Sequence, residues 1–141
     1  MANGLANTDQ WREVALRMLP EFQSDIAEAE TPMRLWTELI FHFDEAYEEP
    51  KEEDLIRRIY SYADWCLEQD AGESAADHLP TCVAVCFWEH IPTCKAARED
   101  MPRWFSYEEL LANEHFFKYE LEAEEWEELK QLYGGKEGSL A

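Results

Sequence analysis

Basic residues are scarce in this 141-residue chain, which has 12 lysines and arginines against 32 aspartates and glutamates. The resulting net charge of −20 is spread along the chain, because residues 1–70 hold 17 acids and 6 bases and residues 71–141 hold 15 and 6. Such a surface repels nucleic-acid phosphate and anionic membranes, so we expect neither as a partner. It attracts basic proteins, although solubility alone also accounts for a charge of this kind.

Long apolar runs are also missing. The run Val83–Trp88 is far shorter than the roughly 20 residues that a membrane-spanning helix needs. The first residues have neither the basic nor the apolar segment of a signal peptide. We therefore expect a cytoplasmic protein whose cysteines are thiols rather than disulfides.

Catalytic and cofactor motifs are absent from the sequence. It has no glycine-rich phosphate loop, no HExxH and no GxSxG. None of the four histidines has a glutamate three positions before it, which excludes the Glu-x-x-His pairs of ferritin-like di-iron proteins. We therefore expect a protein that is not an enzyme and that has no cofactor.

The composition is that of a folded chain. Hydrophobic residues make up 46% and aromatic residues 13%, which is too much for a disordered acidic chain. The length fits one domain. We predict a single helical domain over residues 1–133, a helix end at Gly134–Gly135, and a flexible C-terminal tail over residues 134–141.

The spacing of apolar residues predicts helices along most of the chain. One stripe follows steps of three and four: Trp11, Val14, Ala15, Met18, Leu19 and Phe22. Thr8 or Asp9 is the expected cap at its start, and Pro20 is expected to kink or end it. A further short helix is expected up to Ala29.

Two more helices are predicted on either side of Pro50. Thr31 and Pro32 supply an N-cap and a proline at the first helical position, and apolar residues continue at helical spacing to Tyr47. The next helix is expected over residues 55–67, with its end at residues 70–72.

Residues 75–91 are apolar on nearly every side, which is typical of a buried central helix. A buried strand at Val83–Trp88 is the alternative, but no other segment is a suitable partner strand. Further on, Ser106 and Glu109 form a capping-box motif that opens a helix, and a last helix is expected over residues 121–133. The predicted fold is all-α, with about six to seven helices as antiparallel hairpins in a bundle or a short α-α superhelix.

One constellation resembles a metal site. Cys82, Cys86, His90 and Cys94 recur at steps of four, and thiolate and imidazole are the ligands that zinc prefers. A straight helix cannot bring all four together, because three such steps rise about 18 Å. A thiol nucleophile paired with His90 and oriented by Glu89 is a related alternative. Small buried thiols on an apolar helix face are the simpler interpretation.

Acidic residues are concentrated in two segments. The first surrounds Pro50 and contains Asp44, Glu45, Glu48, Glu49, Glu52, Glu53 and Asp54. The second contains Glu120, Glu122, Glu124, Glu125, Glu127 and Glu128. Trp126 lies among them and is a candidate aromatic anchor, although a core position is more usual for such a residue. Dense like charges cost stability unless solvent or a cationic partner compensates, so both segments are candidate docking surfaces for a basic protein.

Three segments carry a resemblance: IYSYADWCLEQ at 59–69, VAVCFWEHIP at 83–92 and MPRWFSYEEL at 101–110. Together they resemble a small bacterial domain family of unknown function. The resemblance implies a bacterial cytoplasmic protein and supplies no catalytic residues. The acidic charge and the small helical form are also similar in character to immunity proteins that neutralise basic toxins.

These observations favour a non-enzymatic acidic binding protein, of which an immunity-type inhibitor of a basic protein is one form. The alternatives are a metal-binding or thiol-active protein built on Cys82, Cys86, His90 and Cys94, and a structural homodimer. The sequence leaves open whether the chain is a monomer or a homodimer.

Overall fold

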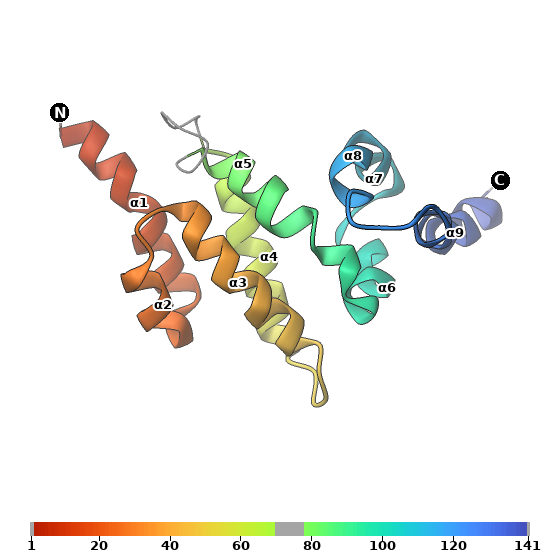
Figure 1. Cartoon of the computed structure of the whole chain (residues 1–141), viewed down its shortest axis with the longest axis horizontal. Helices are drawn as coiled ribbons and strands as arrows, with labels where there is room; N and C mark the ends of the chain where they lie inside the picture. The colour runs from red at the N-terminus through yellow and green to blue at the C-terminus, as the bar shows by residue number, and fades with distance from the viewer. Residues whose placement is uncertain (1, 70–77, 141) are drawn as a thin grey trace. The chain divides into compact units, whose positions relative to one another are not determined.

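A computed structural model describes residues 2–69 and 78–140, and the side chains of residues 10–69 and 78–133. Within those residues the chain forms nine α-helices and no strand, which confirms the predicted all-α class. The helices are α1 (Ala2–Met18), α2 (Gln23–Glu28), α3 (Pro32–Ala46), α4 (Glu53–Leu67), α5 (Leu79–Val83), α6 (Lys95–Trp104), α7 (Tyr107–Ala112), α8 (Glu114–Phe117) and α9 (Ala123–Leu140) (Figure 1). The prediction of six to seven helices was too low, since it missed α6 and α8.

The chain divides into two compact units. Unit 1 is Met1–Phe87 and unit 2 is Trp88–Ala141. Unit 1 has 19 acids and 6 bases, a net charge of −13, and unit 2 has 13 acids and 6 bases, a net charge of −7. That residues 1–133 fold as a single domain stays a prediction.

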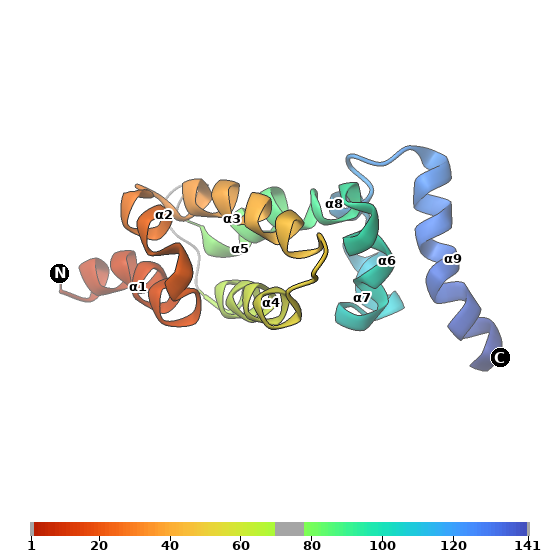
Figure 2. The ribbon, with the colours of Figure 1, turned by 90° about the horizontal axis from the view of Figure 1, so that it is seen from below.

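Unit 1 is built on an antiparallel hairpin of α3 and α4, with α5 packed along both helices (Figures 1 and 2). Helix α1 packs on α4, and α2 contacts both α1 and α3. The core is a cluster of aromatic rings in contact with one another: Trp36, Phe43, Tyr60, Tyr62 and Phe87. The inner faces of α3 and α4 supply four of its five rings.

Two hydrogen bonds explain how α1 and α2 are attached. The buried hydroxyl of Tyr62 donates to the carbonyl oxygen of Trp11 at 3.0 Å, which joins α4 to α1. The Arg12 guanidinium donates to the carbonyl oxygens of Ile26 at 2.6 Å and Ala29 at 2.9 Å. These are among the carbonyls that a helix leaves unpaired at its C-terminus, so Arg12 acts as a side-chain cap of α2.

Helix boundaries in unit 1 agree only in part with the sequence patterns. The start of α3 is confirmed, because the Thr31 hydroxyl accepts from the Arg34 amide at 3.1 Å and Pro32 is at the first helical position. The break at Pro20 is also confirmed by a 3-10 turn over Pro20–Phe22. The expected start of the first helix at Thr8 or Asp9 was wrong, since α1 begins at Ala2. The expected end at residues 70–72 lies outside the described residues.

The predicted central helix over residues 75–91 is helical from Leu79 to Trp88, as α5 and a π-helical turn over Ala84–Trp88. Residues 75–77 lie outside the described part of the chain. The alternative of a buried strand at Val83–Trp88 was wrong. Two consecutive residues of the π turn contact different units. The Phe87 ring contacts Trp36 in unit 1, and the Trp88 ring contacts Phe117 in unit 2.

Unit 2 is made of shorter helices, in which α6 contacts α9 and α7 contacts α8. The predicted capping box of α7 is confirmed: the Glu109 amide donates to the Ser106 hydroxyl at 3.0 Å, and the Ser106 amide donates to the Glu109 carboxylate at 2.8 Å. Helix α6 was missed because Pro102 lies inside it. There the burial of Ala97 and Met101, one turn apart, outweighs the proline.

The last helix ends later than predicted. Helix α9 continues past Gly134 and Gly135 to Leu140. A glycine stop needs a left-handed residue, and no glycine within the described backbone has a positive φ. Glycine inside a helix costs only about 1 kcal/mol, so it permits continuation. Flexibility of residues 134–141 stays a prediction.

Candidate acidic docking surfaces

The first acidic segment lies where α3 ends and α4 begins, and its side chains differ in their surroundings. Some carboxylates are paired: Lys51 Nζ lies 3.0 Å from Glu53, and Asp54 accepts from Arg58 at 2.8 Å and from Arg57 at 3.2 Å. Asp44 is half-buried and has a partner as well. These residues therefore belong to the structure of the turn.

Other carboxylates of the same segment face solvent. Glu48, Glu49 and Glu52 are exposed, and their side chains form no hydrogen bond or ion pair within the part of the chain that the structure describes. Glu45 is exposed too, and its carboxylate lies 3.6 Å from His42 Nδ1. We call Glu45, Glu48, Glu49 and Glu52 the turn surface. It is the portion of the first segment that remains available to a cation.

In the second acidic segment, the carboxylates of Glu125 and Glu127 make local contacts. Glu125 accepts from the Glu122 amide at 2.9 Å at the start of α9, and its other oxygen lies 3.6 Å from Arg98 Nη1. Glu127 pairs with Lys130 at 3.0 Å. The exposed members Glu120, Glu122, Glu124 and Glu128 complete the segment. Two of the predicted binding carboxylates therefore stabilise the helix itself.

Trp126 does not belong to this surface. Its side chain is only 6% exposed, because α9 turns this position towards the core of unit 2. The hypothesis that Trp126 is an exposed aromatic anchor was therefore wrong. The exposed aromatic side chains are Phe41 on α3, at 62%, and Tyr119 just before the second segment, at 69%. Phe41 was detectable in the sequence, since it lies outside the apolar stripe of its helix.

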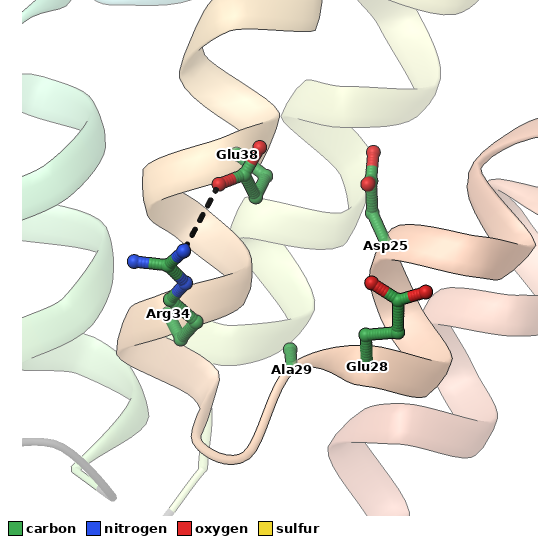
Figure 3. Close-up of a pocket in the computed structure, with 5 residues that line it drawn as sticks. All are labelled: Asp25, Glu28, Ala29, Arg34 and Glu38. Carbon is green, nitrogen blue, oxygen red and sulfur yellow. Dashed lines mark ion pairs between the residues drawn. The ribbon is translucent and has the colours of Figure 1, made fainter.

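A small open cleft lies between α2 and α3. It has a volume of about 190 Å³ and is lined by Asp25, Glu28, Ala29, Arg34 and Glu38 (Figure 3). The Arg34 guanidinium pairs with Glu38 along α3 at 3.8 Å. Asp25 Oδ2 lies 2.7 Å from Nε2 of His42, whose ring stacks on Phe22. With three carboxylates against one guanidinium, the cleft suits a cationic group.

The basic residues of the chain are largely committed to internal pairs. At least eight of the 12 bases lie within ion-pair distance of a carboxylate: Arg34, Lys51, Arg57, Arg58, Arg98, Arg103, Lys118 and Lys130. Arg12 is used as a cap for backbone carbonyls. Because the bases are engaged in this way, little positive charge remains to neutralise the turn surface.

The strongest pair lies inside unit 1. Arg58 donates to both carboxylate oxygens of Glu21, at 2.8 and 2.7 Å, and also to the Met18 carbonyl at 2.9 Å. These hydrogen bonds hold the pKa of Glu21 below its usual value of 4.5 and raise the pKa of Arg58. The pair joins α4 to the 3-10 turn that follows α1, so it stabilises the fold of unit 1.

The cysteine constellation does not assemble. No group of three or more His, Cys, Asp or Glu side chains within residues 2–69 and 78–140 could hold a metal ion. Cys82 is fully buried, whereas Cys86 and Cys94 are half-buried. The Cys86 thiol donates weakly to the Met33 carbonyl at 3.9 Å. The structure therefore does not place Cys82, Cys86, His90 and Cys94 as the ligands of one ion.

Burial changes the pKa of two titratable groups, neither of which is a cysteine of the constellation. Burial raises the pKa of the Cys66 thiol to about 12, which leaves almost no thiolate at neutral pH. Burial also raises the pKa of Glu89, the residue expected to orient His90, although the nearby charge of His90 acts in the opposite direction.

Comparisons with known proteins add no relative: no protein-family model matches the chain, and no significant match was found among curated proteins or solved structures. The resemblance of residues 59–69, 83–92 and 101–110 to a bacterial family therefore stays a prediction. Among the described helices none is both long and apolar enough to cross a membrane. Any statement about function must rest on the chemistry of the chain.

Proposed function

We propose that the protein is a non-enzymatic binding protein that captures a basic protein through its acidic surface, with the turn surface as the main contact. The observation that supports this proposal is that most bases form internal ion pairs, whereas several acids do not. At least eight bases are paired internally, while the side chains of Glu48, Glu49 and Glu52 are exposed and form no hydrogen bond or ion pair among the described residues. Unpaired like charges attract a complementary patch and accelerate encounter with it.

An immunity-type inhibitor is the specific form that we favour for this activity. Such a protein must be folded, strongly acidic and free of a reaction of its own. This chain combines a net charge of −20 with a helical body. A basic target would place its lysines and arginines against the turn surface. Binding at a functional site of the target would by itself block that site. A bacterial cytoplasmic location is part of the same proposal.

The test separates local charge from total charge. The variant E48Q/E49Q/E52Q removes three charges from the turn surface. The control E13Q/E30Q/E68Q removes three exposed charges from elsewhere in unit 1, so both proteins have the same net charge. Binding of a lysine-rich basic protein is measured by calorimetry over a series of salt concentrations. We expect the turn variant to bind about tenfold more weakly and the control to stay within about twofold.

Two outcomes would contradict the proposal. Equal weakening by both variants would mean that only the total charge matters, which is the behaviour expected of a charge that serves solubility. Binding that does not depend on salt would exclude an electrostatic mode of capture. Circular dichroism of both variants establishes that they are folded.

A further inference from the structure

One outward stripe of α3 combines an apolar side chain with acids. Arg34, Glu38, Phe41 and Glu45 follow steps of four, three and four, so their side chains lie on one side of the helix. The opposite side holds the fully buried Leu35, Trp36, Leu39 and Phe43. Phe41 is 62% exposed at the middle of the outward stripe.

The surroundings of Phe41 are negative. Glu38 and Glu45 flank it by one turn on either side, and Glu48 follows at the end of the helix. Arg34, the base of the stripe, is engaged with Glu38 at 3.8 Å. At the same end, Glu38 is shared with the cleft, where Figure 3 shows Asp25 and Glu28 on α2 facing the Arg34–Glu38 side of α3.

The charge decides which occupant fits this stripe. A second copy of the chain would bring Glu38, Glu45 and Glu48 against their own counterparts, and like charges across an interface cost affinity. A partner helix with one apolar residue surrounded by lysine and arginine has the complementary pattern. Steps of three and four also match the ridges and grooves of two packed helices.

We propose that the outward stripe of α3 binds a basic amphipathic helix of a partner protein, with Phe41 as the apolar anchor and Glu38, Glu45 and Glu48 as the acidic rim. A lysine or arginine of that helix enters the cleft beside Glu38. The inference rests on the proposed function, because it names the surface and the partner chemistry for the same capture. An aromatic ring within a polar rim is the usual arrangement of a binding hot spot.

The experiment uses two synthetic peptides of identical composition. One places leucines at steps of three and four with lysines on both sides of them, and the other is a scrambled sequence without an apolar stripe. Binding to the full chain is measured by fluorescence anisotropy at several salt concentrations for the wild type, for Phe41→Ala and for Tyr119→Ala. Tyr119 is the matched control, because it is 69% exposed and adjoins the second acidic segment in unit 2.

We expect the peptide with the leucine stripe to bind more tightly than the scrambled peptide. Phe41→Ala should weaken its binding about tenfold, and Tyr119→Ala should change it less than about twofold. Truncation of an exposed side chain should leave the fold intact, and circular dichroism verifies this.

Other outcomes would overturn either this inference or the proposed function. Equal binding of both peptides, with no effect of Phe41→Ala, overturns the inference but leaves the capture of basic proteins in place if E48Q/E49Q/E52Q still weakens it. A Phe41 effect without salt dependence overturns the proposed function instead. Self-association of the chain that Phe41→Ala abolishes overturns the inference in favour of a homodimer.

Discussion

The two units of this chain use different means to hold their helices together. In unit 1, long helices bury a connected cluster of rings, and Trp36, Phe43, Tyr62 and Phe87 are all fully buried. In unit 2, the helices before α9 are short, Trp88 and Phe105 are only half-buried, and the capping box of α7 supplies local support. Unit 2 also buries side chains fully, among them Met101, Leu110 and Phe117, so the comparison indicates that its burial is spread over shorter helices, whose ends contribute relatively more.

The largest loss of stability is expected from substitutions at the boundary between the two units, where each unit can be tested separately. Phe87→Ala removes a fully buried ring that contacts Trp36, Phe43 and Tyr60, so unit 1 should lose about 3–5 kcal/mol. Trp88→Ala removes a half-buried ring from unit 2 and should cost less. Hydrogen exchange measured by mass spectrometry on peptides from α4 and α7 separates the two losses. Equal loss of protection in both helices after Phe87→Ala would show that the units unfold together.

An intermediate effect on stability is expected for two ion pairs, one in each unit, that contain a glutamate with a lowered pKa. Arg58 lowers the pKa of Glu21 by hydrogen bonding in unit 1, and Lys118 lowers that of Glu114 in unit 2. A carboxyl whose folded pKa lies below its unfolded value contributes stability above the unfolded pKa and loses it as the pH falls. Both contributions should therefore decline as the pH drops through the usual value of 4.5.

The two pairs should differ in size. Arg58→Ala also removes a bond to the Met18 carbonyl, and we expect a loss of about 1–2 kcal/mol at neutral pH, allowing for the solvent screening of Glu21. Lys118→Ala breaks an exposed pair and should have a much smaller effect. Urea denaturation at neutral and acidic pH measures both variants. A loss for Arg58→Ala that is just as large at acidic pH would contradict the assigned cause.

The last comparison concerns the local effect of the helix caps. Ser106→Ala in unit 2 and Thr31→Ala in unit 1 each remove one hydroxyl acceptor, at a cost of about 1 kcal/mol. The six-residue α7 should lose exchange protection along its whole length, whereas α3 should fray only in its first turn because its inner face is buried. Fraying of α3 along its length would contradict the view that burial holds unit 1.

The local features of the fold were largely predictable, because they depend on neighbouring residues. The caps at Thr31 and Ser106 and the break at Pro20 are short-range signals, and all three are confirmed. Helix α6 was not predictable, since its proline argues against a helix and only the burial of Ala97 and Met101 decides in its favour. The extent of α9 was also missed, because two glycines permit a helix end without requiring one.

The candidate surfaces, too, were predictable from the sequence only in part. Both acidic segments are visible in the sequence, but it could not separate carboxylates that pair with Lys51, Arg58 or Arg98 from those that remain exposed. It also placed the aromatic anchor at Trp126, where acids are dense along the chain. Exposure depends on which side of a helix faces the core, and this places Trp126 inside and Phe41 outside.

By itself, the sequence determined the helical class, the acidic excess and the positions of the strongest helix starts. These properties follow from composition and from contacts within a few residues. Only the tertiary structure decided that Cys82, Cys86, His90 and Cys94 do not form a group of ligands, that the bases are largely paired internally, and that Phe41 faces solvent. Distance between side chains and access to water are properties of the packed helices, and residue spacing along the chain constrains them only weakly.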